Sequence, residues 1–332
     1  MTERPRTKVD FWAWRTRECP EKLQNALQGL FSAPGVPVTL SARKSGWNGY
    51  ERAADVMLGT MAVGMVADGG ESQRGWTYVG IPGRGCEWVA DWDRAQEAAA
   101  GCDHYELKRV DLAHDVSNPD AFEQVIAAHR AGEFTTRGRP PSMRKIDTEA
   151  DADGRTIYVG ARSEAKFYRG YEKGKELMGP ELAKARCRPD FDWLDYVMAS
   201  WQRVDDDGQL VIDRMWHWWR HELELKAKGA PLPEDLIDRR DEYFAGAYPY
   251  LGTVLQGVEP TILQMPRDRG PRLDLALALA NVRRQYGPTL FTALTAFHGD
   301  IGAVWDRIVG RRHNDALVRA GVLMVDHFGD EG

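Results

Sequence analysis

The stretch TIYVGARSEAKFYRGYEKGKE, residues 156–176, consists of two strand-like runs joined by a glycine turn. Alternate residues of a strand share a face, so Arg169, Tyr171 and Lys173 are expected on one face of the second run. Cations beside a tyrosine hydroxyl favour the phenolate, which is the better nucleophile. The stretch therefore predicts a β-hairpin that carries a reactive tyrosine. A solvated hairpin or a packed core tyrosine is the alternative interpretation.

The same alternation appears upstream in HYELKRVDLAHDV, residues 104–116, which is predicted to be a strand. Arg109, Asp111 and Asp115 would share one face of it. A buried face does not normally carry three charges unless they pair or bind something. This strand therefore predicts an ion-pair network or a ligand site, with an exposed edge of solvated charges as the alternative.

A third predicted strand, MWHWWRHELELKAKG, spans residues 215–229. One face would carry polar and aromatic side chains: Trp216, Trp218, Arg220, Glu222 and Glu224. His217 and His221 would lie on the other face, about 13 Å apart, which is too far for one zinc ion. The pattern excludes zinc and leaves Glu222 as a candidate ligand for a hard cation.

Strand-like and helix-like runs alternate up to about residue 228, and helical patterns follow the proline-rich GAPLPED. This order predicts a mixed α+β domain and then a helical domain. The expected divisions are an N-terminal segment over 1–35 with one short helix, a main domain over 36–228, and a helical domain over 229–332.

Composition narrows the functional class. The net charge of −6 argues against a non-specific nucleic-acid coat protein, although residues 154–175 alone carry a net charge of +4. The sequence has neither a secretory signal nor an apolar run long enough to span a membrane, and its four scattered cysteines suit reduced thiols, so we expect a cytoplasmic protein. No GKS or GKT phosphate loop is present, so ATP-driven activity has no support.

Four elements in order resemble the replication initiation factor family, the Rep-trans type of rolling-circle initiators of plasmids and filamentous phages, with related relaxases. They are RVDLAHDV, TIYVGAR, RGYEKGKE and WRHELELK, within a resemblance that covers roughly residues 38–228. Ala161 replaces a serine that is usual in the family, and Gly170 stands where an aliphatic residue is common.

The resemblance implies a central antiparallel sheet flanked by helices, as in rolling-circle nucleases. The helical C-terminal domain lies outside the resemblance and is expected from its helical patterns alone. It implies metal-dependent, site-specific nicking and joining of single-stranded DNA through a 5′-phosphotyrosyl intermediate. Tyr171 would be the nucleophile, with Tyr168 as its substitute, and Arg169 and Lys173 would assist. The other expected contacts with DNA are Arg109, Arg162, Lys166 and Arg220.

The candidate metal ligands are carboxylates: Asp111, Asp115, Glu176 and Glu222. We expect two or three of them to be right, and by strand alternation Glu176 faces away from Tyr171 unless the strand ends near Gly174. Such oxygen ligands select Mg²⁺ or Mn²⁺.

The expected partner is single-stranded or extruded origin DNA, and a host helicase and a homodimer stay open. Three alternatives also stay open: a conjugative relaxase with the same site residues, a non-catalytic DNA-binding regulator, and a structural β-hairpin protein with no nucleic-acid role.

Overall fold

The computed structural model describes residues 6–31, 33–136, 138–147, 154–178, 216–263, 275–314 and 317–318. The chain forms two compact units, residues 1–265 and residues 266–332. The boundary expected near residue 228 therefore lies inside the first unit. The helical pattern PDFDWLDYVMASW, residues 189–201, lies outside the described residues.

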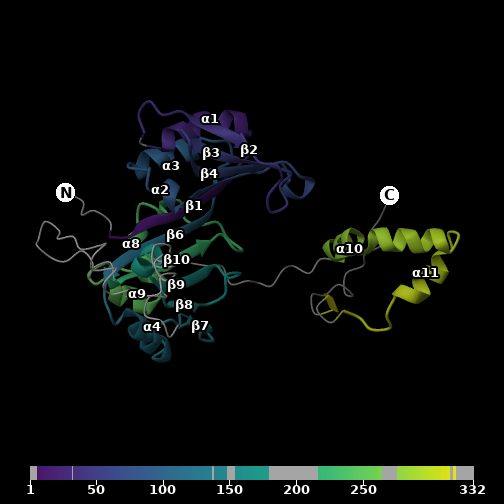
Figure 1. Cartoon of the computed structure of the whole chain (residues 1–332). Coiled ribbons are helices and arrows are strands. Elements are labelled where there is room, and N and C mark those ends of the chain that lie inside the picture. The colour runs from purple at the N-terminus through teal and green to yellow at the C-terminus, as the bar shows by residue number, and fades with distance from the viewer. Residues whose placement is uncertain are drawn as a thin grey trace, which may run out of the picture. The chain divides into compact units, whose positions relative to one another are not determined.

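In the described residues, ten strands form one sheet in the order β2-β3-β4-β5-β1-β6-β10-β9-β8-β7 (Figure 1). Every pairing is antiparallel. The strands are β1 (Lys8–Thr16), β2 (Val38–Ala42), β3 (Arg52–Leu58), β4 (Met61–Asp68), β5 (Thr77–Pro82), β6 (Glu106–Ser117), β7 (Met143–Ile146), β8 (Thr156–Val159), β9 (Lys166–Glu172) and β10 (Trp218–Lys226).

The helices with described bounds are α1 (Pro20–Leu30), α2 (Gly83–Cys86), α3 (Trp92–Ala100), α4 (Ala121–Arg130), α8 (Arg240–Ala247), α9 (Pro249–Val254), α10 (Leu275–Ala296) and α11 (Ile301–Ile308). Short 3-10 turns span Glu71–Gln73 and Glu234–Leu236. The expected α+β class, with an antiparallel sheet and a helical C-terminal part, is confirmed. None of the described helices is long and apolar enough to cross a membrane.

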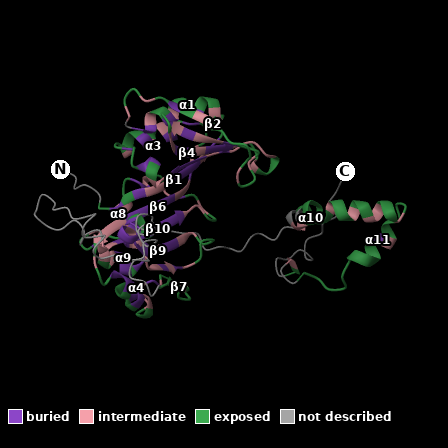
Figure 2. Cartoon of the chain, viewed as in Figure 1, coloured by how far each residue is buried: buried purple, intermediate pink, exposed green. Residues whose placement is uncertain are grey.

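One face of the sheet packs against helices and forms the core. Trp12 of β1 contacts Trp92 of α3, and Trp219 of β10 contacts Phe122 of α4. On the same side, His221 contacts Tyr250 of α9. Figure 2 shows buried residues along the central strands β1, β6 and β10, whereas α10 and α11 in the second unit are mostly exposed.

Strand β1 was not anticipated, because the first 35 residues had been set apart from the main domain. In the structure β1 lies at the centre of the sheet, between β5 and β6. Trp12 and Trp14 are almost fully buried there. Burial of two large aromatic side chains makes this segment part of the core.

Helix α10 runs through Pro288, a residue type that often ends a helix. A proline removes its own N–H from the helical hydrogen bonds and disfavours the turn before it, but it does not always end the helix. The hydroxyl of Thr292 donates to the Pro288 carbonyl, 2.9 Å away.

Candidate active site

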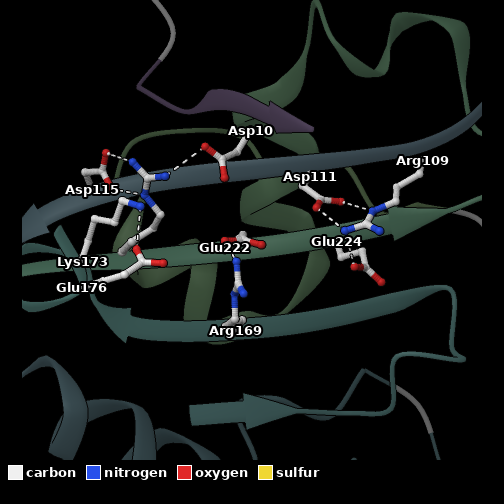
Figure 3. A network of polar contacts seen from close by, with 10 residues as sticks. Asp10, Arg109, Asp111, Asp115, Arg169, Lys173, Glu176, Glu222 and Glu224 are labelled. Atoms are coloured by element: carbon white, nitrogen blue, oxygen red, sulfur yellow. Dashed lines mark hydrogen bonds and ion pairs between the residues drawn. The ribbon is translucent and has the colours of Figure 1, made fainter. Parts of the chain in front are cut away.

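Charged side chains line the sheet face opposite the helices, on β6, β10 and β9 (Figure 3). The register places Arg220 of β10 between Asp115 and Tyr171. In the next row Glu222 lies opposite Arg169, and beyond it Glu224 lies opposite Asp111. The predicted alternation is confirmed within β6, β9 and β10, whereas Lys173 and Trp216, which were expected on the same faces, lie beyond the ends of β9 and β10.

Arg220 holds the end of this face nearest Tyr171. Its Nε and Nη2 donate to the two carboxylate oxygens of Asp115 at 2.7 and 3.0 Å, and its Nη1 donates to Asp10 at 2.9 Å. The ammonium of Lys8 pairs with Asp115 at 2.5 Å. Burial raises the pKa of Asp115, but the hydrogen bonds from Arg220 and Lys8 outweigh it and lower the pKa to about 2. Asp115 is therefore ionised at neutral pH.

Arg109 lies at the end of the face farther from Tyr171 and binds the carboxylates there. Its Nε and Nη2 donate to Asp111 at 2.8 and 2.6 Å, and Nη2 also pairs with Glu224 at 2.6 Å. Asp111 is only 3% exposed, and burial raises its pKa to about 7 despite Arg109, with a further contribution from the charges of Glu222 and Glu224. Asp111 therefore titrates near neutrality.

Arg169 connects the middle of the face to the tyrosine. Its Nη2 donates to Glu222 at 2.5 Å, and its guanidinium carbon lies 4.8 Å from the centroid of the Tyr171 ring. A guanidinium over an aromatic face is attracted to the ring. Glu222 thus fixes Arg169 beside Tyr171.

Tyr171 is 7% exposed, with the ammonium of Lys173 at 5.7 Å from its ring centroid. Burial raises the pKa of Tyr171, and the charge of Glu222 raises it further. Arg220 and Arg169 act in the opposite direction but do not compensate. The expectation that the neighbouring cations favour the phenolate is therefore wrong for this arrangement, and the hydroxyl is a neutral phenol that must lose its proton when it attacks.

Glu176 lies near Tyr171 because of a helical turn, which strand periodicity does not predict. Strand β9 ends at Glu172, and residues 173–178 are helical. Lys173 donates to Glu176 at 2.6 Å across three residues of this turn. The charge of Glu176 acts on the pKa of Tyr171. The strand therefore ends before Gly174, which is the case in which Glu176 was not expected to face away from Tyr171.

The four candidate metal ligands do not converge. The part of the chain that the structure describes contains no group of three Asp, Glu, His or Cys residues placed to hold a metal ion. Each candidate instead pairs with a cation of the chain: Asp111 with Arg109, Asp115 with Arg220, Glu222 with Arg169, and Glu176 with Lys173. A divalent ion would have to displace at least one of these cations, and metal binding stays a prediction.

Two expected DNA contacts lie elsewhere. Lys166 is on the helix-covered side of β9, where its ammonium donates to the Ala247 carbonyl at 2.7 Å and burial lowers its pKa to about 8. Arg162 lies in the turn between β8 and β9, with its guanidinium 5.7 Å from the centroid of the Phe167 ring. Arg109 and Arg220 are on the charged face, engaged with carboxylates.

Tyr168 does not share the site. It is fully buried on the opposite face, where its hydroxyl hydrogen-bonds to Nδ1 of His221 at 2.8 Å. Burial raises its pKa well above the usual value. The alternation of side chains along β9 therefore separates the two tyrosines and leaves Tyr171 alone on the charged face of that strand.

The sequence did not identify Lys8 and Asp10 as site residues, although both bind the Asp115–Arg220 pair. The alternation of Trp12 and Trp14 with smaller or charged neighbours in KVDFWAWRT was the available signal. Glu224 had been placed on the correct face but not selected. Because it pairs with Arg109, it belongs to the same network.

Comparisons with known proteins agree with the expected family. Residues 105–189 match the family described as replication initiation factor, which confirms the resemblance over the segment that contains β6, β8 and β9. No curated protein matches the chain. A solved structure of a rolling circle replication initiator protein from Geobacillus stearothermophilus is similar at 21% sequence identity and a TM-score of 0.43, covering 67% of this chain and 74% of that one.

Proposed function

We propose that the chain initiates rolling-circle replication by cutting one strand of its origin DNA and later rejoining it, with Tyr171 as the nucleophile. The observation that carries the proposal is the position of Tyr171. It is the tyrosine of β9 on the charged face, its ring lies beside Arg169, and it pairs in register with Arg220. The match of residues 105–189 to replication initiation factors supports the same function.

In the proposed reaction the phenolic oxygen of Tyr171 attacks a backbone phosphorus. A bond forms between that oxygen and phosphorus, and the bond from phosphorus to the 3′ oxygen breaks. The phenol loses its proton, and the leaving 3′ oxygen gains one. The products are a free 3′-OH, which primes synthesis, and a 5′-phosphotyrosyl link. A second transesterification reverses the exchange and releases the displaced strand as a circle. One phosphodiester replaces another, so no nucleotide cofactor is needed, in keeping with the missing phosphate loop.

The neighbouring cations would bind the scissile phosphate. Arg169 and Lys173 flank the tyrosine ring, and Arg220 lies next to it in the sheet. Guanidinium and ammonium groups held in place before the reaction stabilise the negative charge that develops on the phosphate oxygens. Arg162, at the turn before β9, would contact the strand further away. Lys166, on the opposite face, is left out of this role.

Glu222 or Glu176 would take up the phenolic proton. These are the two carboxylates whose charges raise the pKa of Tyr171. We retain Mg²⁺ or Mn²⁺ as the expected cofactor; a hard cation would supply Lewis acidity at the phosphate. Because the described carboxylates are ion-paired rather than gathered, this dependence needs a direct test. Recruitment of a host helicase and formation of a homodimer also stay predictions.

The decisive experiment is covalent trapping. Purified protein is incubated with labelled single-stranded DNA from its own replicon, with Mn²⁺, Mg²⁺ or EDTA, and is then run on a denaturing gel. We expect a shifted band that EDTA abolishes and that Tyr171→Phe does not form. The matched control is Tyr158→Phe, which changes a half-buried tyrosine opposite Arg169 on the next strand. An adduct in Tyr171→Phe would refute the assignment of the nucleophile.

The same assay separates the alternatives. Tight DNA binding with no adduct across the whole replicon would favour the non-catalytic regulator. A conjugative relaxase would form the same adduct, but on DNA from a transfer origin and not on DNA from a replication origin. An adduct that forms equally well in EDTA would refute the metal dependence alone.

A further inference from the structure

A second group of side chains, outside the charged network, forms an aromatic patch of Trp47, Tyr50, Trp76 and Tyr78. The Trp47 and Tyr78 rings lie with centroids 4.7 Å apart, and Tyr50 lies within 6.4 Å of both. All four residues are only partly buried, and none belongs to the hydrophobic core cluster of the sheet. Core packing therefore does not explain them.

The loop between β2 and β3 presents two of these rings on a tight turn. Trp47 and Tyr50 exchange both backbone hydrogen bonds, at 3.1 and 2.9 Å. The two residues between them, Asn48 and Gly49, have φ angles of 46° and 84°. Asn-Gly with both residues at positive φ is the combination that tight hairpin turns favour. The turn thus places the two rings side by side, stacked with their centroids 6.4 Å apart.

Two arginines of the β1 end accompany the patch. The guanidinium carbons of Arg15 and Arg17 each lie 4.1 Å from the centroid of the Trp76 ring. Arg15 also pairs with Glu106 at 2.6 Å, whereas Arg17 is exposed and has no ion pair among the described residues. Trp76 therefore lies against two cations. Arg15 is opposite Tyr78 in the sheet, and Arg17 is free of any described carboxylate.

The patch lies on the same face of the sheet as Tyr171. Tyr78 pairs in register with Arg15, and Arg15 pairs with Glu106. The charges of Arg109 and Asp111 act on the pKa of Tyr78, which burial raises to about 12. The charged face thus continues across β6 and β1 to the patch. From the strand spacing and the rise per residue, the backbones of Tyr78 and Tyr171 are roughly 30 Å apart.

We infer that the aromatic patch, with Arg15 and Arg17, is a second binding site for the single strand on which Tyr171 acts, and that it stacks unpaired bases several nucleotides from the scissile phosphate. Partly exposed aromatic rings beside arginines are the combination that binds single strands without regard to sequence, by base stacking and backbone contacts. The continuity of the face with the Tyr171 site selects a nucleic-acid strand over a protein segment. The inference rests on the proposed function.

The test measures binding rather than cleavage. The full chain in EDTA is titrated into labelled oligothymidylate of about 20 nucleotides, longer than the site of one binding module, and anisotropy is read. We expect Trp47→Ala to weaken binding about tenfold, the size of the loss of one base–aromatic stack, and Trp47→Phe to retain most of it. The control is Trp88→Ala, a tryptophan 40% exposed outside the patch, which should leave binding unchanged.

A second readout guards against a folding defect and against failure of the nicking proposal. Trp47→Ala should still form the covalent adduct with a saturating amount of origin DNA. Equal binding by Trp47→Ala and the wild-type chain would overturn the inference, as would an equal loss in Trp88→Ala. If the wild-type chain forms no adduct at all, the nicking proposal fails, whereas a tenfold effect of Trp47→Ala would still establish the patch as a single-strand site.

Discussion

Replacing Gly170 by alanine tests the packing behind the candidate nucleophile. A Cβ at this position would lie 2.5 Å from the Tyr168 hydroxyl and 2.6 Å from the Trp219 ring. Both side chains are almost fully buried, so neither can move into open space. Overpacking of this kind costs about 1–3 kcal/mol, and the intrinsic gain from Gly to Ala returns about 0.5–1 kcal/mol. We expect a net loss of about 1–2 kcal/mol in the free energy of unfolding.

The assay is urea unfolding followed by tryptophan fluorescence, together with the trapping assay at a temperature where the variant is folded. Because Gly170 precedes Tyr171 in β9, displacement of the strand should also slow adduct formation. The control is Gly29→Ala in α1, where the added Cβ would lie 3.5 Å from the Cβ of Ala98. Alanine there should stabilise the chain by up to about 1 kcal/mol. Unchanged or increased stability of Gly170→Ala would refute the packing argument.

Two further predictions concern buried polar groups. Burial lowers the pKa of His221 to about 3, so the unfolded chain takes up a proton below about pH 6.5 and the folded chain does not. The wild-type chain should therefore lose about 2 kcal/mol of unfolding free energy at pH 5 relative to pH 8 through this residue. Urea titrations of His221→Gln at both pH values should lack that loss. An equal change in unfolding free energy between the two pH values in the variant and the wild type would contradict the assignment. Arg220→Met should lower the free energy of unfolding by about 3 kcal/mol, because it leaves Asp115 and Asp10 without their main cation. Adding Asp115→Asn should restore part of this loss. Strictly additive effects of the two substitutions would show that the pair is not coupled.

Strand periodicity alone predicted the charged face, because neighbouring residues of β6, β9 and β10 point to opposite sides. It could not predict which cation each carboxylate binds, since that depends on register between distant strands. Nor could it anticipate Glu176 near Tyr171, which requires β9 to end at Glu172.

The prediction that neighbouring cations favour the phenolate of Tyr171 is wrong for a related reason. The neighbours of Tyr171 in the sequence are cationic. The two causes that raise its pKa, burial and the carboxylate of Glu222 on another strand, cannot be read from the local sequence. Gly170 illustrates the opposite case. It departs from the family pattern, in which an aliphatic residue is common, and the structure shows that a glycine fits because the Tyr168 and Trp219 side chains occupy the space.

The charge balance of the face bears on how DNA would be held there. The charged groups named around Tyr171 are five cations and six carboxylates: Lys8, Arg109, Arg169, Lys173 and Arg220, with Asp10, Asp111, Asp115, Glu176, Glu222 and Glu224. Affinity for a phosphate backbone comes from cations that release counterions, and these cations already have partners. The site can position a phosphate but contributes little net attraction to it. The affinity for the strand must therefore come from other parts of the protein, and Arg17 with the aromatic patch is a described surface that could supply it. On this argument, single-strand binding in EDTA should weaken more in Arg17→Ala than in Arg169→Ala, and the reverse order would show that the charged face itself holds the DNA.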